Sequence, residues 1–246
     1  MKITSVNNDL VKETAKLLRG KYRDELGLFL IEGEKGVKEA LEAGVIIERI
    51  FTLEGVKGYP EDKVIETTEA VLGKISDAKT YPKVIAVAKQ LKSNNDNFKN
   101  FNKVLLLEDI KDAGNLGTIL RTVSAFGIDG VVLFGDTVDL YNPKTVRSAV
   151  GCLWKVPVIQ IKDYNILEDM FCQHERIATL PKGLNVVNLN DYIPAKKTLV
   201  MFGSEANGLS DKLKKFATTN LTIEMAPNVE SLNLSISVAI VAYKLR

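Results

Sequence analysis

Short apolar runs alternate with amphipathic stretches along the chain, which is the pattern of an α/β protein. Before residue 91, apolar runs predict strands at 28–33, 46–53 and 84–88. Apolar residues at helical spacing predict helices at 9–19, 34–43 and 68–75, with a polar turn after the first of them. This part of the chain is therefore expected to form a small α/β domain.

After residue 102 the apolar runs are more continuous, as in parallel strands that are buried on both faces. The first run is Lys103–Leu107, and a helix is expected after it at 115–126. Further strands are expected at 131–134, 156–161, 177–180, 198–202 and 221–223, and further helices after Pro143, near 164–173 and near 210–216. The alternation predicts a parallel sheet that binds its ligand at the carboxyl ends of the strands.

Two segments are harder to assign. Residues 91–100 are rich in asparagine, which predicts a linker at 93–102 between domains at 1–92 and 103–246. Near the end of the chain, residues 231–238 alternate polar and apolar side chains like a strand, whereas residues 238–245 have the composition of an apolar helix. The pattern alone leaves both possibilities open.

Composition excludes several classes of protein. The longest apolar run, Val238–Tyr243, has six residues, and a membrane-spanning helix needs about 20. The N-terminus lacks the apolar core of a signal peptide, so a cytoplasmic location is expected. Cys152, Cys172 and the single histidine, His174, are too few for a standard zinc site, so no metal is expected.

The formal net charge of +2 does not by itself indicate a nucleic-acid-binding protein. Residues 1–23, however, are mostly basic among their charged side chains. The candidate phosphate-binding residues in this segment are Lys12, Lys16, Arg19, Lys21 and Arg23. Such a segment can meet RNA phosphates, and a solvated helix face is an equally good interpretation.

Three loops that follow expected strands gather small and polar residues. The first, 108–117, contains Asn115 and leads to Arg121, which projects away from the apolar stripe of its helix. An arginine near a helix N-terminus favours an anionic or ribose-phosphate ligand. A surface arginine on an amphipathic helix fits the pattern as well.

The second loop, 202–210, has glycines that permit tight turns or close approach of a ligand, and a single acid, Glu205. The third, 224–233, brings Ser231 and Asn233 to an otherwise apolar segment. Local turn formation and helix capping are the alternative interpretations of these polar residues. The chain contains neither G-x-x-x-x-G-K-[ST] nor G-x-G-x-x-G. The absence of the second motif, the glycine fingerprint of dinucleotide-binding folds, disfavours a nicotinamide-dependent dehydrogenase.

Taken in order, the three loops resemble the motifs of the SpoU group (TrmH-like) in the SPOUT superfamily of RNA methyltransferases. The matching stretches are 115–121, 202–209 and 223–235, and the resemblance covers roughly 103–246. Residues 29–42 also resemble the L30e-like substrate-binding domain that is often attached to these enzymes.

The resemblance implies a fold and a reaction. The C-terminal domain would be a parallel sheet with a deep trefoil knot, its last segment a helix, and it would form a homodimer. S-adenosylmethionine would contact Gly203, Ile223 and Leu232. The methyl group would pass to a ribose 2′-hydroxyl of RNA, with ribosomal RNA favoured over transfer RNA and no metal required.

The resemblance also implies roles for five polar residues. Arg121 matches the arginine that activates the ribose hydroxyl. Because arginine is a poor proton acceptor, it would act as a base with help from the substrate phosphate, or it would orient the hydroxyl and stabilise the developing negative charge. The residues that would shape the site are Asn115, Glu205, Ser231 and Asn233. A non-catalytic RNA-binding protein that retains the fold is the alternative, and the presence of all these residues argues against it.

Overall fold

A computed structural model describes residues 1–91, 95–183 and 185–246. By its internal contacts the chain divides into two compact units. The first combines Met1–Lys92 with Asp139–Lys155, and the second combines Ser93–Val138 with Val156–Arg246. The segment 139–155, which the sequence places in the C-terminal domain, therefore packs with the N-terminal unit.

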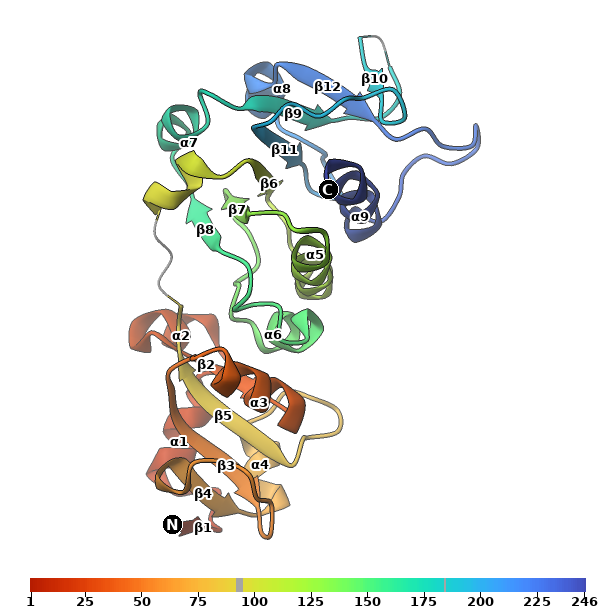
Figure 1. The fold of residues 1–246 in the computed structure, drawn as a ribbon. Helices are drawn as coiled ribbons and strands as arrows, with labels where there is room; N and C mark the ends of the chain where they lie inside the picture. Colours follow the sequence, from red (N-terminus) through yellow and green to blue (C-terminus); the bar gives the residue numbers. More distant parts are fainter. Residues whose placement is uncertain (92–94, 184) are drawn as a thin grey trace. The chain divides into compact units, whose positions relative to one another are not determined.

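The first unit is built on a five-stranded mixed sheet in the order β1-β4-β3-β5-β2 (Figure 1). Its strands are β1 (Lys2–Ile3), β2 (Leu28–Glu32), β3 (Ile47–Leu53), β4 (Val64–Thr67) and β5 (Val84–Lys89). Its helices are α1 (Asp9–Lys16), α2 (Gly20–Leu26), α3 (Glu34–Glu42), α4 (Glu69–Lys74) and α6 (Pro143–Ala149), with a 3-10 turn η1 (Glu61–Lys63). Side chains of α1 and α4 share one core with those of β2, β3 and β5. The α/β prediction for this unit is confirmed.

The sequence misses one helix and two short strands of this unit. The segment expected to be a polar turn forms helix α2, which ends at Gly27 with a left-handed φ of 63°. The short strands β1 and β4 were also not expected. Strand β4 pairs in parallel with β1 on one side and with β3 on the other, and such long-range pairing cannot be read from a short local pattern.

The linker expected at 93–102 is only partly a linker. Residues 92–94 lie outside the described part of the chain, whereas Asn95–Asn100 form the 3-10 helix η2. Phe98 is fully buried in the core of the second unit, and its ring lies 4.9 Å from that of Phe101. A Cβ at Gly130 would lie 2.7 Å from the Phe98 ring. This segment is therefore anchored to the second unit, and Gly130 leaves space for the anchor.

The second unit contains a seven-stranded sheet in the order β10-β12-β9-β11-β6-β7-β8. The pairings between its strands are all parallel, which confirms the predicted parallel sheet. Its strands are β6 (Lys103–Glu108), β7 (Gly130–Phe134), β8 (Val158–Ile161), β9 (Glu175–Thr179), β10 (Val187–Asn188), β11 (Thr198–Phe202) and β12 (Thr219–Thr222). The helices are α5 (Ala113–Phe126), α7 (Tyr164–Met170), α8 (Asp211–Phe216) and α9 (Leu234–Leu245).

The order of the strands predicts where a ligand binds. From β6 the chain moves outward to β7 and β8, and it then returns to build the other half of the sheet, with β11 next to β6. The direction of winding thus changes at β6 and β11. Ligands of open α/β sheets bind beyond the carboxyl ends of the strands at such a point. The loops after β6 and β11 are the first two of the three loops noted in the sequence.

The C-terminal segment is a helix, as expected from the family resemblance, and the strand-like alternation at 231–238 is misleading. Asn233 caps helix α9 by accepting a hydrogen bond from the Ser235 backbone N–H at 2.8 Å. Helix α9 packs beside α5 (Figure 1), where the Phe126 and Tyr243 rings meet edge to face at 5.6 Å. Because apolar residues lie on nearly every face of this helix, its sequence lacks the amphipathic pattern by which a surface helix is usually predicted.

Candidate active site

A cavity of about 410 Å³ lies at the carboxyl ends of β9, β11 and β12, next to the start of α9. We call it the strand-end cavity. Its lining residues are Thr179, Leu180, Pro181, Phe202, Gly203, Ser204, Glu205, Gly208, Leu221, Ile223, Met225, Glu230, Ser231, Leu232, Asn233, Leu234 and Ser237. The cavity is therefore built from the second and third loops together with the end of β9.

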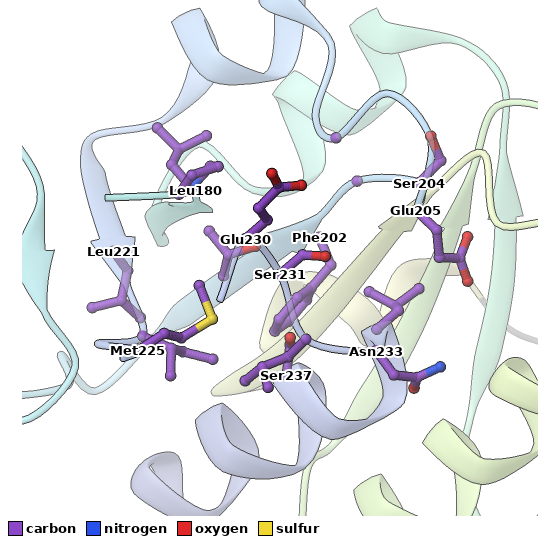
Figure 2. Close-up of a pocket in the computed structure, with 17 residues that line it drawn as sticks. Leu180, Phe202, Ser204, Glu205, Leu221, Met225, Glu230, Ser231, Asn233 and Ser237 are labelled. Carbon is purple, nitrogen blue, oxygen red and sulfur yellow. The ribbon is translucent and has the colours of Figure 1, made fainter. Parts of the chain in front are cut away.

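The strand-end cavity has an apolar side and a polar side. Figure 2 shows Leu180, Leu221 and Met225 on one side, and Glu205 and Asn233 on the other. Its volume falls in the range of small-molecule sites, about 300–1,000 Å³. Apolar walls with acids at the rim suit a ligand that carries both an apolar body and positive charge. S-adenosylmethionine, with its sulfonium, is such a ligand, so the residues present fit the expected cofactor.

Three of the polar residues expected at the site are joined by hydrogen bonds. Asn115 Nδ2 donates to Glu205 Oε1 at 2.7 Å. Asn233 Nδ2 donates to Asn115 Oδ1 at 3.1 Å. Each residue comes from a different loop, so the chain of bonds ties together the first, second and third loops. We call these residues the Asn-Glu-Asn bridge.

The bridge answers one question that the sequence left open. Asn233 was compatible with helix capping or with a place in the site, and it does both. Its Oδ1 accepts from the Ser235 backbone N–H at 2.8 Å and from Ser235 Oγ at 2.6 Å, while its Nδ2 donates to Asn115. Ser231 is exposed at the cavity, and its side chain makes no hydrogen bond within the described residues.

The second loop is a tight turn held by its own backbone. Gly208 N–H donates to the Ser204 carbonyl at 2.9 Å, and Gly208 has a left-handed φ of 64°. A Cβ at Gly203 would lie 1.9 Å from the Gly208 carbonyl carbon. Of the two interpretations of this glycine, the structure supports the tight turn, because the closest approach is by the loop itself.

One residue that positions this loop was not singled out from the sequence. Glu108, at the end of β6, is only 5% exposed, and its Oε2 accepts from the Ser210 backbone N–H at 2.7 Å. It thereby links the first strand of the domain to the end of the second loop. The signal was available, because an acid that ends a wholly apolar strand needs a buried partner.

Arg121 is exposed on α5, outside the lining of the strand-end cavity. It points away from the buried stripe, which contains Leu116, Ile119, Leu120 and Val123. It forms no ion pair or hydrogen bond with the described residues. On an ideal helix it lies about 9 Å along the axis from Asn115 and about 120° around it. The structure therefore does not bring Arg121 together with the Asn-Glu-Asn bridge.

The basic residues of the first helices divide into two groups. Lys12, Lys16, Arg19 and Lys21 are exposed, and we call them the basic helix cluster. The prediction that Arg23 binds RNA is wrong, because this residue is only 2% exposed. Its Nε donates to Asp139 Oδ2 at 2.6 Å and its Nη1 to the Leu17 carbonyl at 2.7 Å.

The described residues contain neither a metal-binding cluster nor a membrane-spanning helix. Within residues 1–91, 95–183 and 185–246, histidine, cysteine, aspartate and glutamate form no group of three or more that could hold a metal ion. No helix in the same ranges has the length and apolar character to cross a membrane.

Known proteins resemble the chain over nearly its whole length. The model of the SpoU rRNA Methylase family matches residues 102–243, and the model of the MRM3-like substrate binding domain matches residues 8–86. The 23S rRNA (guanosine(2553)-2′-O)-methyltransferase RlmP of Bacillus subtilis is 31% identical over 99% of this chain and 98% of that protein.

Two further relatives agree with these matches. An uncharacterized tRNA/rRNA methyltransferase of Synechocystis is 31% identical, with 99% of this chain and 93% of that protein covered. The crystal structure of an AdoMet-bound rRNA methyltransferase from Sinorhizobium meliloti superimposes with a TM-score of 0.87 at 26% identity, covering 99% of this chain and 96% of that one. The chain belongs to the SpoU rRNA methylase family.

Proposed function

We propose that this protein transfers a methyl group from S-adenosylmethionine to a ribose 2′-hydroxyl of ribosomal RNA. The observation that carries the proposal is the strand-end cavity, at whose edge the Asn-Glu-Asn bridge joins the three family motifs. The relatives of this chain include a ribosomal RNA 2′-O-methyltransferase and an AdoMet-bound ribosomal RNA methyltransferase. By the same relationship the protein acts where ribosomes are found, which we take to be the cytoplasm.

The strand-end cavity is the proposed cofactor site, with Gly203, Ile223 and Leu232 as contacts. When bound, the cofactor supplies a methyl group on a positively charged sulfur. The apolar lining keeps water from the reacting centre, and the carboxylates of Glu205 and Glu230 at the rim favour the positive charge.

Arg121 is the proposed catalytic residue. Its guanidinium presents a planar fork of N–H donors, and it is exposed and without a partner in the described residues. Such a group can orient a ribose hydroxyl and stabilise the negative charge that develops on its oxygen. Asn115, Glu205 and Asn233 hold the three loops in place, and Ser231 supplies a hydroxyl at the cavity.

We assign RNA capture to residues 1–92, as an L30e-like domain, and methyl transfer to residues 103–246, although the segment 139–155 packs with the first unit. The match to a substrate-binding domain at 8–86 supports this division, as does the basic helix cluster.

The order of the strands supports a trefoil knot in the second unit. β12 lies beyond β9, yet the chain after it returns to pack α9 against α5.

The exposed face of α9 supports a homodimer formed through the second unit. Ile236, Ile240 and Tyr243 are 50%, 37% and 54% exposed, and their spacing of four and three residues puts them on one side of the helix. A second copy would cover this apolar stripe and bring the active site close to the interface. A monomeric mass in light scattering at micromolar concentration would contradict the dimer.

Methyl transfer from labelled S-adenosylmethionine to RNA tests the function. The RNA is total RNA from a strain that lacks the gene, and the matched variant is Arg121→Ala. The wild type should label ribosomal RNA at ribose 2′-oxygens. The variant should stay folded and bind cofactor, yet lose about 10²–10⁴-fold in rate.

Arg121→Lys should restore little activity, because lysine lacks the planar fork of arginine. Near-normal transfer by Arg121→Ala would contradict the assigned role. An inactive wild type that still binds RNA would favour the alternative, a non-catalytic RNA-binding protein.

A further inference from the structure

A second cavity, of about 360 Å³, lies wholly within the first unit. It is formed where the end of β2 and the beginning of α3 meet α6 and the residues after it, and we call it the α3–α6 cavity. The polar residues of its lining are Glu32, Glu34, Lys35, Glu39, Arg147 and Trp154. Nothing in the proposed methyl transfer uses these residues.

Three polar atoms in this lining are buried without a hydrogen-bond partner in the described chain. They are Glu32 Oε1, Glu39 Oε2 and Trp154 Nε1. The Glu32 side chain is only 2% exposed, and burial raises the pKa of its carboxyl group, with Arg147 opposing that shift. A buried polar group without a partner is costly and calls for an explanation, such as a ligand or water.

Both cations of the lining are already engaged, and Lys35 Nζ lies 4.0 Å from Glu39 Oε1. Arg147 Nη1 lies 3.0 Å from Glu32 Oε2 and also pairs with Asp77. Ser76 Oγ donates to the same Glu32 oxygen at 3.0 Å. These contacts fix the Glu32 carboxylate and leave its Oε1 as the available acceptor. With three acids in the lining, and with its lysine and its arginine both paired to acids, the cavity disfavours a phosphate or another anion.

The unpartnered atoms define what a ligand must offer. Two carboxylate oxygens require N–H or O–H donors, and the Trp154 indole N–H requires an acceptor. An ammonium or guanidinium group supplies donors alone. A nucleobase supplies donors and acceptors on one small plane, and guanine combines N1–H and the N2 amino group on one edge with the acceptors O6 and N7.

We propose that the α3–α6 cavity binds an unpaired guanine base of the RNA substrate, with Glu32 and Glu39 accepting from its Watson–Crick edge and Trp154 donating to it. The proposal rests on the proposed function, because it takes RNA as the substrate. Recognition of unstacked bases on their Watson–Crick edge is the usual mode of single-stranded RNA binding.

The backbone beside the cavity has the strain that is typical of functional sites. Val150 has a φ of 44°, and Gly151 has a φ of 72°. The left-handed region is unfavourable for a β-branched residue. At Gly151 a Cβ would lie 1.8 Å from Glu39 Oε2, so glycine is what allows this carboxylate to lie against the loop.

Trp154 is the only tryptophan of the chain, so its fluorescence reports directly on this cavity. The full-length protein is titrated with guanosine, inosine and uridine, with S-adenosylhomocysteine added to saturate the strand-end cavity. Guanosine should give a saturable change in fluorescence, together with a matching heat in calorimetry. Inosine, which lacks the N2 amino group, should bind several-fold more weakly, and uridine more weakly still.

Two variants test the assigned carboxylates. Glu39→Gln and Glu32→Gln should each weaken guanosine binding about tenfold, the effect of losing a hydrogen bond to a charged group. Glu39→Gln is the safer variant, because Glu39 pairs with the exposed Lys35 at 4.0 Å, whereas the buried Glu32 pairs with Arg147 at 3.0 Å. Thermal melting of both variants shows whether they remain folded. The matched control is Glu42→Gln, which removes an acid of α3 that lies outside the cavity lining.

Three outcomes would overturn the proposal. They are no saturable fluorescence change and no heat with guanosine, equal affinity for guanosine and uridine, and unchanged affinity in a folded Glu39→Gln variant. Any of them would leave a cavity that holds water only. Methyl transfer by the wild type is measured separately, so a failure here is distinguishable from a failure of the proposed function.

Discussion

Replacing the amide donor of Asn115 with a carboxylate acceptor should break the Asn-Glu-Asn bridge. Asn115 Nδ2 lies 2.7 Å from Glu205 Oε1, so Asn115→Asp would set two carboxylates face to face. Unit charges at this separation repel by about 1.5 kcal/mol in water and by about 6 kcal/mol at an effective dielectric constant of about 20. Glu205 is exposed, so the lower value applies, and the lost hydrogen bond to a charged group adds about 1.5 kcal/mol.

We expect the repulsion to separate the first and second loops and to weaken cofactor binding. If half of the sum of about 3 kcal/mol reaches the strand-end cavity, the affinity for S-adenosylmethionine falls about tenfold. Like charges raise the pKa of one carboxyl group of such a pair. The affinity should therefore recover as the pH falls from 8 toward 5.5, because protonation of that group removes the repulsion.

Calorimetry with S-adenosylmethionine at the two pH values measures the effect. Asn115→Ala, which loses the bonds without adding a charge, should bind more weakly than the wild type and show no such recovery at low pH. Thr118→Asp adds the same charge to an exposed position of the same helix, and it should bind normally. Wild-type affinity for Asn115→Asp at pH 8 would refute the assignment of the bridge to the cofactor site.

Three further predictions concern other parts of the molecule. Gly203→Ala should displace the second loop and lower cofactor affinity at least tenfold in calorimetry, because its Cβ would overlap backbone at 1.9 Å, whereas at Gly183 the nearest atom is at 3.9 Å and alanine should be neutral. Burial lowers the pKa of His174, so the neutral imidazole stabilises the fold above pH 6.5, and this stability is lost as the pH falls through the lowered pKa. His174→Gln should therefore reduce the fall of the urea unfolding midpoint between pH 7 and pH 5. An unchanged fall of the midpoint would contradict this. Changing the basic helix cluster to glutamine should reduce the salt dependence of RNA binding by about 0.7 in log–log slope per lost phosphate contact, and an unchanged slope would show that RNA binds elsewhere.

The sequence was informative where local pattern and long-range pairing agree. The buried parallel strands, such as β6 and β11, are continuous apolar runs, so their positions were predictable. The three motif loops were found because each follows such a strand. The bonds between Asn115, Glu205 and Asn233 join residues about a hundred positions apart, and only the family motifs suggested that these residues belong together.

The sequence was misleading where a side chain finds its partner far along the chain. Arg23 looks like its basic neighbours in α1 and α2, but Asp139 lies 116 residues away and supplies its ion pair. Phe98 lies in an asparagine-rich stretch and is nevertheless fully buried. The burial of these two residues cannot be predicted from composition, because it depends on which distant residues the fold places beside them.

The same long-range pairs decide where the first unit ends. Arg23 pairs with Asp139, and the buried Glu32 carboxylate pairs with Arg147. Removing one partner of a buried ion pair costs about 3–5 kcal/mol, and a domain has only about 5–15 kcal/mol of stability. A fragment that ends at residue 92 would lose both partners at once, at a cost of about 6–10 kcal/mol, which is comparable with the whole stability of a domain. The segment 139–155 therefore belongs to the N-terminal unit in energy as well as in contacts, although the family motifs on either side of it belong to the methyltransferase domain.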